Sequence, residues 1–384
     1  MRVASAFAIV AGWIGVAGCG ASSGLEVDVV GSADAAPFPP LGGYAGPFVR
    51  SVTTNGTTCA ALDTGAVYCW GYNGVWNVGD GTQIDRARPV RVLGVPPARR
   101  VSCNGVCCAI TEQSDVYCWG QGTDADPLDR SLVVVPPRRI GGVTDIVAIE
   151  AWPNPCAISG TGQVWCWGGA DPLPRRVPGI GPMRSFSRWR TCGVGADGIG
   201  RCWSRDFATV EFRAWRDHVS PDGTWLSMPE LGPLRSLQVH DLAALAVGTD
   251  GRMFGWGRDF ENGGRSNLGE RLESGRFVEL RRLPASRDVR LFHWGACAVG
   301  TDDIVRCWGN NFADPSCRPL GPLACDLDAR PFVSNITDFD AGAFSACAVR
   351  TDGSLWCWGP NQWGEIGDGT TQPRWEPTRV EFPR

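Results

Sequence analysis

The sequence predicts an all-β fold, a seven-bladed β-propeller with about 50 residues per blade, and three observations predict it. A short motif with two strand-like arms around a turn occurs seven times along the chain. In six copies a Cys opens the motif and a second Cys follows ten residues later. Glycine (51) and proline (28) make up about a fifth of the 384 residues, which interrupts the chain too often for long helices.

The full motif consists of a Cys, nine further residues, a second Cys and then Trp-Gly. The seven copies occupy residues 59–71, 108–120, 156–168, 192–204, 245–257, 297–309 and 347–359. The fourth copy has Ser204 in place of the final Gly, and the fifth has Leu245 and Gly255 in place of both cysteines. A period near 50 residues, with strands bounded by Gly and Pro, favours a propeller over a solenoid.

Each copy has the pattern of a β-hairpin whose arms meet at the two cysteines. In the first copy, pairing Cys59 with Cys69 leaves residues 63–65 as a three-residue loop, with Gly65 where a positive φ is required. Opposed residues of an antiparallel pair have Cα atoms about 4.5–5.5 Å apart, which suits a disulfide. We therefore expect an intra-blade hairpin disulfide in six blades, and the joint replacement of both cysteines by Leu245 and Gly255 in the fifth copy is typical of bonded partners.

Twelve of the 17 cysteines belong to these hairpins. The predicted pairs are Cys59–Cys69, Cys108–Cys118, Cys156–Cys166, Cys192–Cys202, Cys297–Cys307 and Cys347–Cys357. Cys103 with Cys107, and Cys317 with Cys325, form two further local pairs, and Cys19 is left over. Zinc sites require converging Cys groups, and the Cys103 to Cys108 segment has no second group near it in sequence, so we expect no metal and no cofactor.

Further strand candidates flank the hairpins. Residues 48–54 precede the first hairpin and 88–94 follow it, while residues 331–339 are expected to form one strand before the last hairpin. The terminal segment 377–382 has the pattern of 89–94, and we expect it to close the ring by pairing into the first blade. The Trp that each copy carries at one position is expected to pack between neighbouring blades.

The N-terminal sequence predicts that the protein is exported. Arg2 and the apolar stretch 3–16 have the layout of a signal peptide, and the stretch is too short to span a bilayer. The Val-Ala-Gly-Cys sequence that ends at Cys19 resembles the lipobox of bacterial lipoproteins, which implies a diacylated Cys19 at the mature N-terminus. Gly20 directly after this Cys resembles the pattern of Gram-negative lipoproteins that are sorted to the outer membrane. The sequence leaves open on which face of that membrane the protein lies.

Three segments follow from these patterns. We predict a lipoprotein signal peptide over residues 1–18, a lipidated Cys with a flexible tether over 19–47, and the propeller over 48–384. The tether is rich in Gly, Ala, Ser and Pro and has no sustained hydrophobic period.

The repeat resembles that of the regulator of chromosome condensation family, whose seven-bladed propellers carry a Cys-Trp-Gly hairpin followed by an Asn–Gly-rich segment. The hairpin half occurs in all seven copies. The Asn–Gly half is well matched only at residues 73–82 and 361–370, is partial at 262–270 and from Asn310, and is essentially absent in blades two to four. The resemblance implies the fold; the family's nuclear roles are incompatible with the export signal.

Composition and motifs argue against catalysis and nucleic-acid binding. The net charge is −4, and His218, His240 and His293 are scattered without a nucleophile or metal motif. The Asp residues of the hairpin loops, and residues 80–82 and 368–370, are expected to form turns rather than Ca²⁺ sites. We therefore expect no enzyme activity.

The variable part of each repeat is the segment after Trp-Gly, which predicts a binding face on a constant scaffold. Large aromatic residues in these loops are candidate contacts with a partner. They are Trp76, Trp215, Trp225 and Trp363, and docking is expected around blade four, at residues 204–230. The predicted function is a non-catalytic cell-envelope scaffold that binds a protein or glycan. The alternatives are an inhibitor of an exported hydrolase such as a β-lactamase, as one extracellular relative implies, or an envelope hydrolase or lyase.

Overall fold

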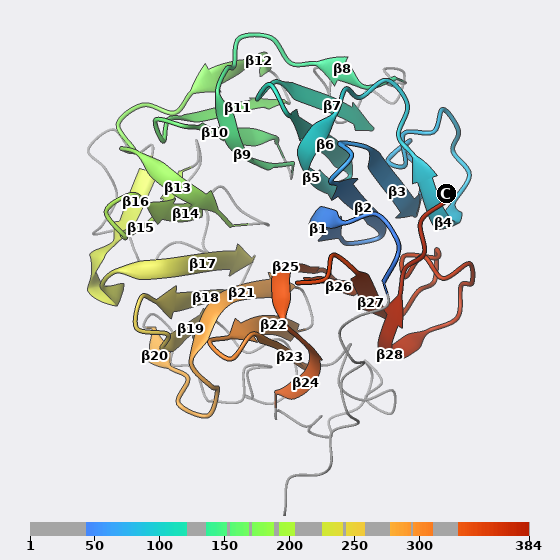
Figure 1. The fold of residues 1–384 in the computed structure, drawn as a ribbon. Coiled ribbons are helices and arrows are strands. Elements are labelled where there is room, and N and C mark those ends of the chain that lie inside the picture. Colours follow the sequence, from blue (N-terminus) through green and yellow to red (C-terminus); the bar gives the residue numbers. More distant parts are fainter. Residues whose placement is uncertain are drawn as a thin grey trace, which may run out of the picture. The chain divides into compact units, whose positions relative to one another are not determined.

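The computed structural model describes residues 44–120, 136–151, 154–168, 171–187, 192–203, 225–240, 243–257, 277–292, 295–309 and 329–383. The chain divides into two compact units, Met1–Pro37 and Phe38–Arg384, and every described residue lies in the second. Seven four-stranded antiparallel sheets make up this unit, each from four consecutive strands. They are arranged as blades in a ring, so the predicted seven-bladed propeller is confirmed (Figure 1).

Each blade consists of four strands that are consecutive in the chain. Blade one contains β1 (Val49–Thr54), β2 (Thr57–Leu62), β3 (Val67–Gly71) and β4 (Arg86–Arg91), and blade two contains β5 (Ala98–Asn104), β6 (Val106–Thr111), β7 (Val116–Gly120) and β8 (Arg138–Arg139). Blade three contains β9 (Ile146–Glu150), β10 (Cys156–Ser159), β11 (Val164–Gly168) and β12 (Asp171–Arg176), and blade four contains β13 (Met183–Phe186), β14 (Cys192–Gly195), β15 (Gly200–Trp203) and β16 (Trp225–Met228). Blades five to seven contain β17 (Leu234–His240), β18 (Ala243–Gly248), β19 (Met253–Gly257), β20 (Val278–Glu279); β21 (Ser286–Phe292), β22 (Gly295–Gly300), β23 (Ile304–Gly309), β24 (Arg330–Ser334); and β25 (Ile336–Ala341), β26 (Ala346–Arg350), β27 (Leu355–Gly359), β28 (Arg374–Arg379). A 3-10 helix, η2 (Pro229–Leu231), follows β16.

The first strand of each blade lies nearest the centre of the ring (Figure 1). Each of these inner strands contacts the inner strands of the blades before and after it, and β25 contacts β1, so the ring is closed. Successive antiparallel strands place the first-to-second turn and the third-to-fourth connection of a blade at one rim, which we call the loop face. The hairpin turns and the links between blades lie at the other rim, the turn face.

The prediction that the terminal strand pairs into blade one is wrong. β28 pairs with β27 and is the fourth strand of blade seven, because blade one already holds β4 at the same position. The resemblance between segments 377–382 and 89–94 reflects this equivalence. The segment 331–339 also splits, since Asn335 at φ 59° separates β24 of blade six from β25 of blade seven.

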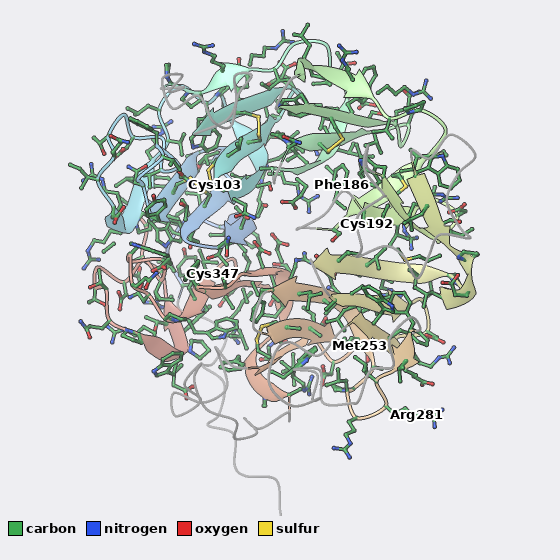
Figure 2. The ribbon with its side chains drawn as sticks, turned by 180° about the vertical axis from the view of Figure 1, so that it is seen from behind. Cys103, Phe186, Cys192, Met253, Arg281 and Cys347 are labelled. Carbon is green, nitrogen blue, oxygen red and sulfur yellow. A yellow bond between two sulfur atoms is a disulfide. The ribbon has the colours of Figure 1, made fainter. Side chains whose placement is uncertain are left out.

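The predicted hairpin register is confirmed. Cys59 faces Cys69 across β2 and β3, and Gly65 in the loop has φ 79°. The six hairpin disulfides lie within the blades, with Cα atoms 3.8–4.1 Å apart (Figure 2). Leu245 and Gly255 occupy the same register in blade five. Cross-links of this kind restrict the unfolded chain and contribute about 2–3 kcal/mol each in the chain-entropy account.

Among the described residues, the core consists of seven hydrophobic clusters, one between each pair of neighbouring blades. The repeat Trp of each blade joins the cluster shared with the blade before it. Trp70, for example, has no exposed surface and packs with Cys347, Val349 and Cys357 of blade seven. Packing between blades, as predicted for these tryptophans, is confirmed.

The hairpin-loop aspartates stabilise their turns. Asp197 accepts the backbone N–H of Ile199 at 3.0 Å and pairs with Arg201 at 2.5 Å. The hydrogen bond from Arg201 lowers the pKa of Asp197 to about 2. Asp302 has the same arrangement with Ile304 and Arg306.

Candidate functional site

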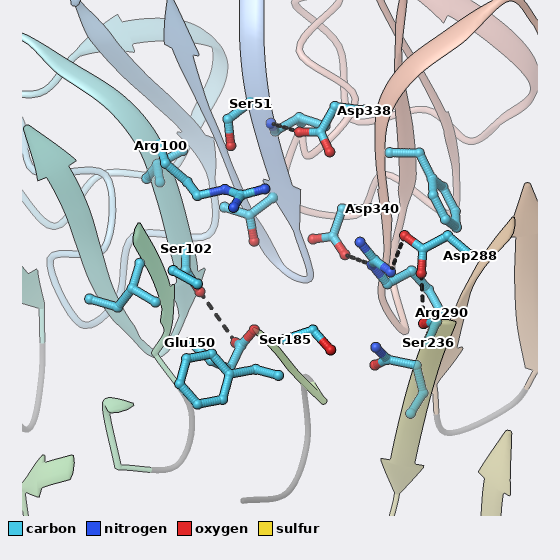
Figure 3. Close-up of a pocket in the computed structure, with 18 of the residues that line it drawn as sticks. Ser51, Arg100, Ser102, Glu150, Ser185, Ser236, Asp288, Arg290, Asp338 and Asp340 are labelled. Carbon is cyan, nitrogen blue, oxygen red and sulfur yellow. Dashed lines mark hydrogen bonds and ion pairs between the residues drawn. The ribbon is translucent and has the colours of Figure 1, made fainter. Parts of the chain in front are cut away.

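The inner strands enclose a central cavity of about 490 Å³ (Figure 3). Their residues alternate, so that hydrophobic side chains pack between blades and polar ones line the cavity. One tier of lining residues lies opposite the first residue of the hairpin: Thr53, Ser102, Glu150, Gln238, Arg290 and Asp340. A second tier lies two residues upstream: Ser51, Arg100, Ala148, Ser185, Ser236, Asp288 and Asp338.

Lining side chains also cover the exposed edges of the inner strands. The inner strand of a sheet has unpaired N–H groups along one edge, which require acceptors. Asp338 accepts the N–H of Val52 at 3.0 Å, and Asp340 accepts the N–H of Thr54 at 2.7 Å. These bonds run from blade seven to blade one, so the cavity lining also stabilises the closure of the ring.

Blades six and seven contribute an acidic wall around one arginine. Arg290 Nη1 lies 2.8 Å from Asp288 Oδ2, and its Nε lies 3.4 Å from Asp340 Oδ1. Ser236 Oγ donates to the other oxygen of Asp288 at 2.7 Å. Desolvation acts to lower the pKa of Arg290, but the neighbouring carboxylates outweigh it and raise that pKa above its ordinary value. Arg290 therefore stays charged and neutralises part of the wall.

Asp338 lies beside this network without an ion pair of its own within 4.0 Å among the described residues. Desolvation raises its pKa to about 6, opposed by the charge of Arg100 and the hydrogen bond from Val52. Arg100 extends into the cavity from the facing wall (Figure 3). The cavity thus has a carboxyl on one side and a guanidinium on the other.

On the loop face, residues 73–85 and 361–374 form two matching loops. The Asn73 side chain donates to the carbonyls of Thr82 and Ile84 and accepts the N–H of Val78 at 2.9 Å. Asn361 makes the same three bonds in blade seven. The conserved layout explains the Asn of the repeat, because a single amide side chain closes a loop of ten or more residues.

The Asp-Gly-Thr segments within these loops are turns. Asp80 accepts the N–H and hydroxyl of Thr82 and pairs with Arg86 Nε at 2.7 Å. Asp368 pairs with Arg374 Nε at 2.6 Å in the same way. Their carboxylates therefore have cationic and N–H partners, an arrangement that serves the turn rather than Ca²⁺.

Each of the two loops also reaches the repeat Trp of the next blade. Trp119 Nε1 donates to the carbonyl of Asn77 at 2.7 Å, and Trp70 Nε1 donates to the carbonyl of Glu365 at 2.8 Å. Within the described residues, the buried Nε1 atoms of Trp167, Trp308 and Trp358 have no acceptor. The Asn–Gly half of the repeat thus adds a hydrogen bond between blades.

The four predicted contact tryptophans differ in their settings. Trp363 is half-buried on the loop face, with its ring 4.8 Å from Phe344 and 5.3 Å from Tyr72; we call these three residues the aromatic cluster. Trp76 is half-buried in the first loop at φ 58°. Trp225 was expected in a loop, but it is the first residue of β16, opposite Trp203. Trp215 lies outside the described residues.

The loop placement predicted for Trp225 is wrong because the segment 204–230 contains the strand β16. β16 pairs with β15 along its whole length, and Trp225 packs against the cluster between blades three and four. A stretch bounded by Asp, Gly and Pro looked irregular in sequence, whereas the pairing partner that defines β16 is 22 residues away at Trp203.

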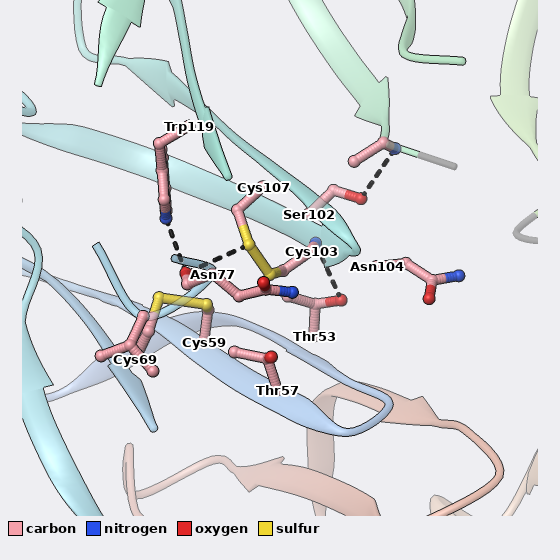
Figure 4. The surroundings of a disulfide bond; sticks show 12 residues. Thr53, Thr57, Cys59, Cys69, Asn77, Ser102, Cys103, Asn104, Cys107 and Trp119 are labelled. Atoms are coloured by element: carbon pink, nitrogen blue, oxygen red, sulfur yellow. Dashed lines mark hydrogen bonds between the residues drawn. A yellow bond between two sulfur atoms is a disulfide. The ribbon is translucent and has the colours of Figure 1, made fainter. Parts of the chain in front are cut away.

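The structure also bonds Cys103 to Cys107, across β5 and β6 (Figure 4). Their sulfurs and that of Cys59 lie within 4.8 Å of one another, the one such group of metal-ligand types found in the described residues. Each sulfur belongs to a disulfide, and a disulfide lacks the thiolate that zinc binds. Cys19, Cys317 and Cys325 lie outside the described residues.

The cavity lining was not predicted from the sequence. The signal was present, because polar residues recur six to nine positions before the first residue of each hairpin, at alternate positions of a strand. Asp338, Asp340 and Arg100 all fit this rule.

No helix among the described residues is long and apolar enough to cross a bilayer.

Comparisons with known proteins agree with the repeat. Residues 352–384 match the regulator of chromosome condensation (RCC1) repeat, and residues 336–362 match a second profile of that repeat. Both matches lie in blade seven, and the resemblance seen in the sequence is confirmed. No curated protein sequence matches the chain.

Several solved structures are similar to this chain over most of its length. Human WBSCR16 is 15% identical, with 87% of this chain and 83% of that chain covered and a TM-score of 0.46. Prp20p from Saccharomyces cerevisiae, described with its binding to Gsp1p and histones, is 16% identical, with 87% and 77% covered and a TM-score of 0.45. PorZ, a surface component of the type-IX secretion system of Porphyromonas gingivalis, is 9% identical, with 88% and 39% covered and a TM-score of 0.46.

Proposed function

We propose that this protein is a non-catalytic recognition scaffold of the bacterial cell envelope, anchored by a lipid on Cys19, and that it binds a protein partner on the loop face. The observation that supports this proposal most is that each blade has a constant structural part and a variable loop. The hairpin, its disulfide and its Trp build the ring, while the third-to-fourth connections vary in sequence and length. Variable loops on a constant frame are the usual form of a binding face.

The aromatic cluster supports a protein partner. Tyr72, Phe344 and Trp363 meet at the junction of blades seven and one, and all three rings remain partly exposed. Trp and Tyr are enriched among the residues that dominate protein interfaces, because they supply a large rigid contact area. The loop that presents Trp363 is held by Asn361, so the ring is positioned before binding.

The docking face can be tested with single alanine variants. Trp363→Ala should weaken partner binding at least tenfold, because a half-buried interface Trp contributes above about 1.4 kcal/mol when truncated. Phe48→Ala is the matched control, since Phe48 is 39% exposed and precedes β1 on the turn face. The measurement is affinity capture from an envelope extract, followed by titration of the purified partner.

The outcomes separate the candidate functions. Retention of only a glycan would replace the protein partner with a lectin-like role. A captured exported hydrolase whose activity falls on binding would favour the inhibitor. Equal binding by Trp363→Ala and loss with Phe48→Ala would refute docking on the loop face.

The anchor is tested separately. Cys19→Ala removes the acyl acceptor, so the protein should move from the membrane fraction to the soluble fraction, since a signal-peptide lipobox works only with Cys. Cys317→Ala serves as a control for cysteine loss away from the N-terminus. Membrane retention of Cys19→Ala, measured by fractionation and immunoblot, would contradict a lipid anchor at this residue.

A further inference from the structure

The central cavity has features of a ligand site that the loop-face proposal does not use. Its volume of about 490 Å³ falls within the range of small-molecule pockets, about 300–1,000 Å³. Most such pockets are apolar, whereas this one is lined by side chains of both charges and by hydroxyl groups. A lining of this kind selects a small and strongly polar solute.

Two cavity arginines, Arg100 and Arg235, have side chains without a hydrogen bond or ion pair within the described part of the chain, and of these Arg100 belongs to the second tier. The Arg100 side chain is exposed to the cavity (Figure 3). The preceding Arg99 bonds to the carbonyl of Ile146 at 2.7 Å, and Arg290 pairs with two carboxylates. Unlike these two, Arg100 has five N–H donors available to a carboxylate or a phosphate.

Hydroxyl groups accompany this arginine. Ser51 lies on β1, next to Arg100 around the second tier and between it and Asp338. Ser185 also faces the cavity, and its buried Oγ has no hydrogen-bond partner among the described residues. A buried hydroxyl without a partner costs free energy, which a polar ligand would recover.

The opposite wall bears a net negative charge. Asp288, Asp338 and Asp340 supply three carboxyl groups against the guanidinium groups of Arg290 and Arg287, and Arg287 is paired with Asp303. Asp338 uses one oxygen for the N–H of Val52, which leaves its other oxygen available. This wall would attract an ammonium group and repel a polyanion.

We propose that the central cavity binds a small zwitterionic solute, an amino acid or a short peptide, with its carboxylate on Arg100 and its ammonium group at Asp338. A monoanion would leave Asp338 unmatched, and a cation would leave Arg100 unmatched. A neutral sugar would match neither charge. Only a ligand that carries both charges satisfies both walls at once.

The test uses the full chain and alanyl-alanine, with its N-acetyl and C-amide forms, in isothermal titration calorimetry. The free dipeptide should bind at least tenfold more tightly than either blocked form. Arg100→Gln should abolish the preference over the amide, and Asp338→Asn should abolish the preference over the N-acetyl form. Asn keeps an acceptor for the Val52 N–H, so the ring closure is retained.

Arg235→Gln is the matched control, since Arg235 is the other open cavity arginine but lies outside the two tiers, one residue before Ser236. This variant should bind as the wild type does. Equal affinity for the free and blocked dipeptides would overturn the proposal. So would the absence of binding by alanyl-alanine and a mixed dipeptide pool at 10 mM, or loss of the carboxylate preference in Arg235→Gln rather than Arg100→Gln. Loop-face binding by Trp363→Ala is measured separately, so either idea can fail alone.

Discussion

The Trp70→Ala variant is expected to have a free energy of unfolding about 3–5 kcal/mol below that of the wild type. The Trp70 side chain has no exposed surface and fills the cluster between blades seven and one. Its Nε1 also donates to the carbonyl of Glu365 at 2.8 Å. Truncation therefore opens a cavity and removes one of the two donors to the Glu365 carbonyl, which keeps only the Thr58 hydroxyl, at the place where the ring closes. Urea titration monitored by fluorescence and circular dichroism measures the loss.

A pair of conservative variants separates the packing from the hydrogen bond. Trp70→Phe and Trp358→Phe both replace a fully buried repeat Trp at an interface between blades. Trp70 loses a donor that is in use, whereas Trp358 Nε1 has no acceptor among the described residues. Trp70→Phe should therefore cost about 0.5–1.5 kcal/mol more than Trp358→Phe, since only the former removes a hydrogen bond, while the Thr58 hydroxyl still donates to the Glu365 carbonyl. Equal losses in the two variants would mean that the bond from the loop to Trp70 contributes nothing.

This comparison tests how a propeller holds its ends together without a shared sheet. Blade one and blade seven each contain four strands of their own, so closure depends on side chains and loops. Asp338 and Asp340 cap the inner edge of β1, the loop of blade seven bonds to Trp70, and Phe382 packs edge-on against Trp70 at 6.0 Å. Closure is thus distributed from the central cavity to the outer rim.

The parts of the fold that sequence could predict are those set by local spacing. The ten-residue offset of Cys59 and Cys69, with Gly65 in the loop, determines the hairpin, its register and its disulfide. All of these lie within a dozen residues, and seven copies repeat the signal. The repeat Trp was predictable for the same reason, because one position in every blade can have only one packing role.

The features that sequence did not predict depend on partners far along the chain. Asp338 and Val52 are 286 residues apart, and Arg100 faces Asp338 only because blades two and seven flank blade one. In the sequence Trp225 resembles a loop residue, because the strand that pairs with it, β15, lies far from it along the chain. Polar residues at alternate positions of the inner strands were visible in the sequence, but they indicate a shared cavity only once the ring is known.

The Glu365→Gln variant is expected to be more stable than the wild type by about 3 kcal/mol above pH 7, with no difference below pH 4.5. The Glu365 side chain is fully buried, and its Oε1 has no partner within the described residues, while Oε2 accepts the N–H of Trp363 at 2.9 Å. Desolvation raises the pKa of Glu365 from 4.5 to about 7.

The sign follows from proton binding. Between pH 4.5 and 7 the folded protein holds a proton on Glu365 that the unfolded chain has released, so the stability of the wild type falls as the pH rises through this window and levels off above it. Gln remains neutral throughout and lacks this decline. Asp338, with its pKa raised to about 6, titrates in both proteins and cancels in the difference.

Glu376→Gln is the matched control, because Glu376 is exposed on β28. Urea titrations at pH 4.5, 6 and 8 should give Glu376→Gln the pH profile of the wild type and give Glu365→Gln a flatter one. Parallel profiles for all three proteins would mean that Glu365 is ionised at no cost in the folded state, and hence that the loop of blade seven admits water to its carboxylate. A flatter profile would instead locate a pH-dependent weakness at the junction where Trp70, Thr58 and the carbonyl of Glu365 join blade seven to blade one.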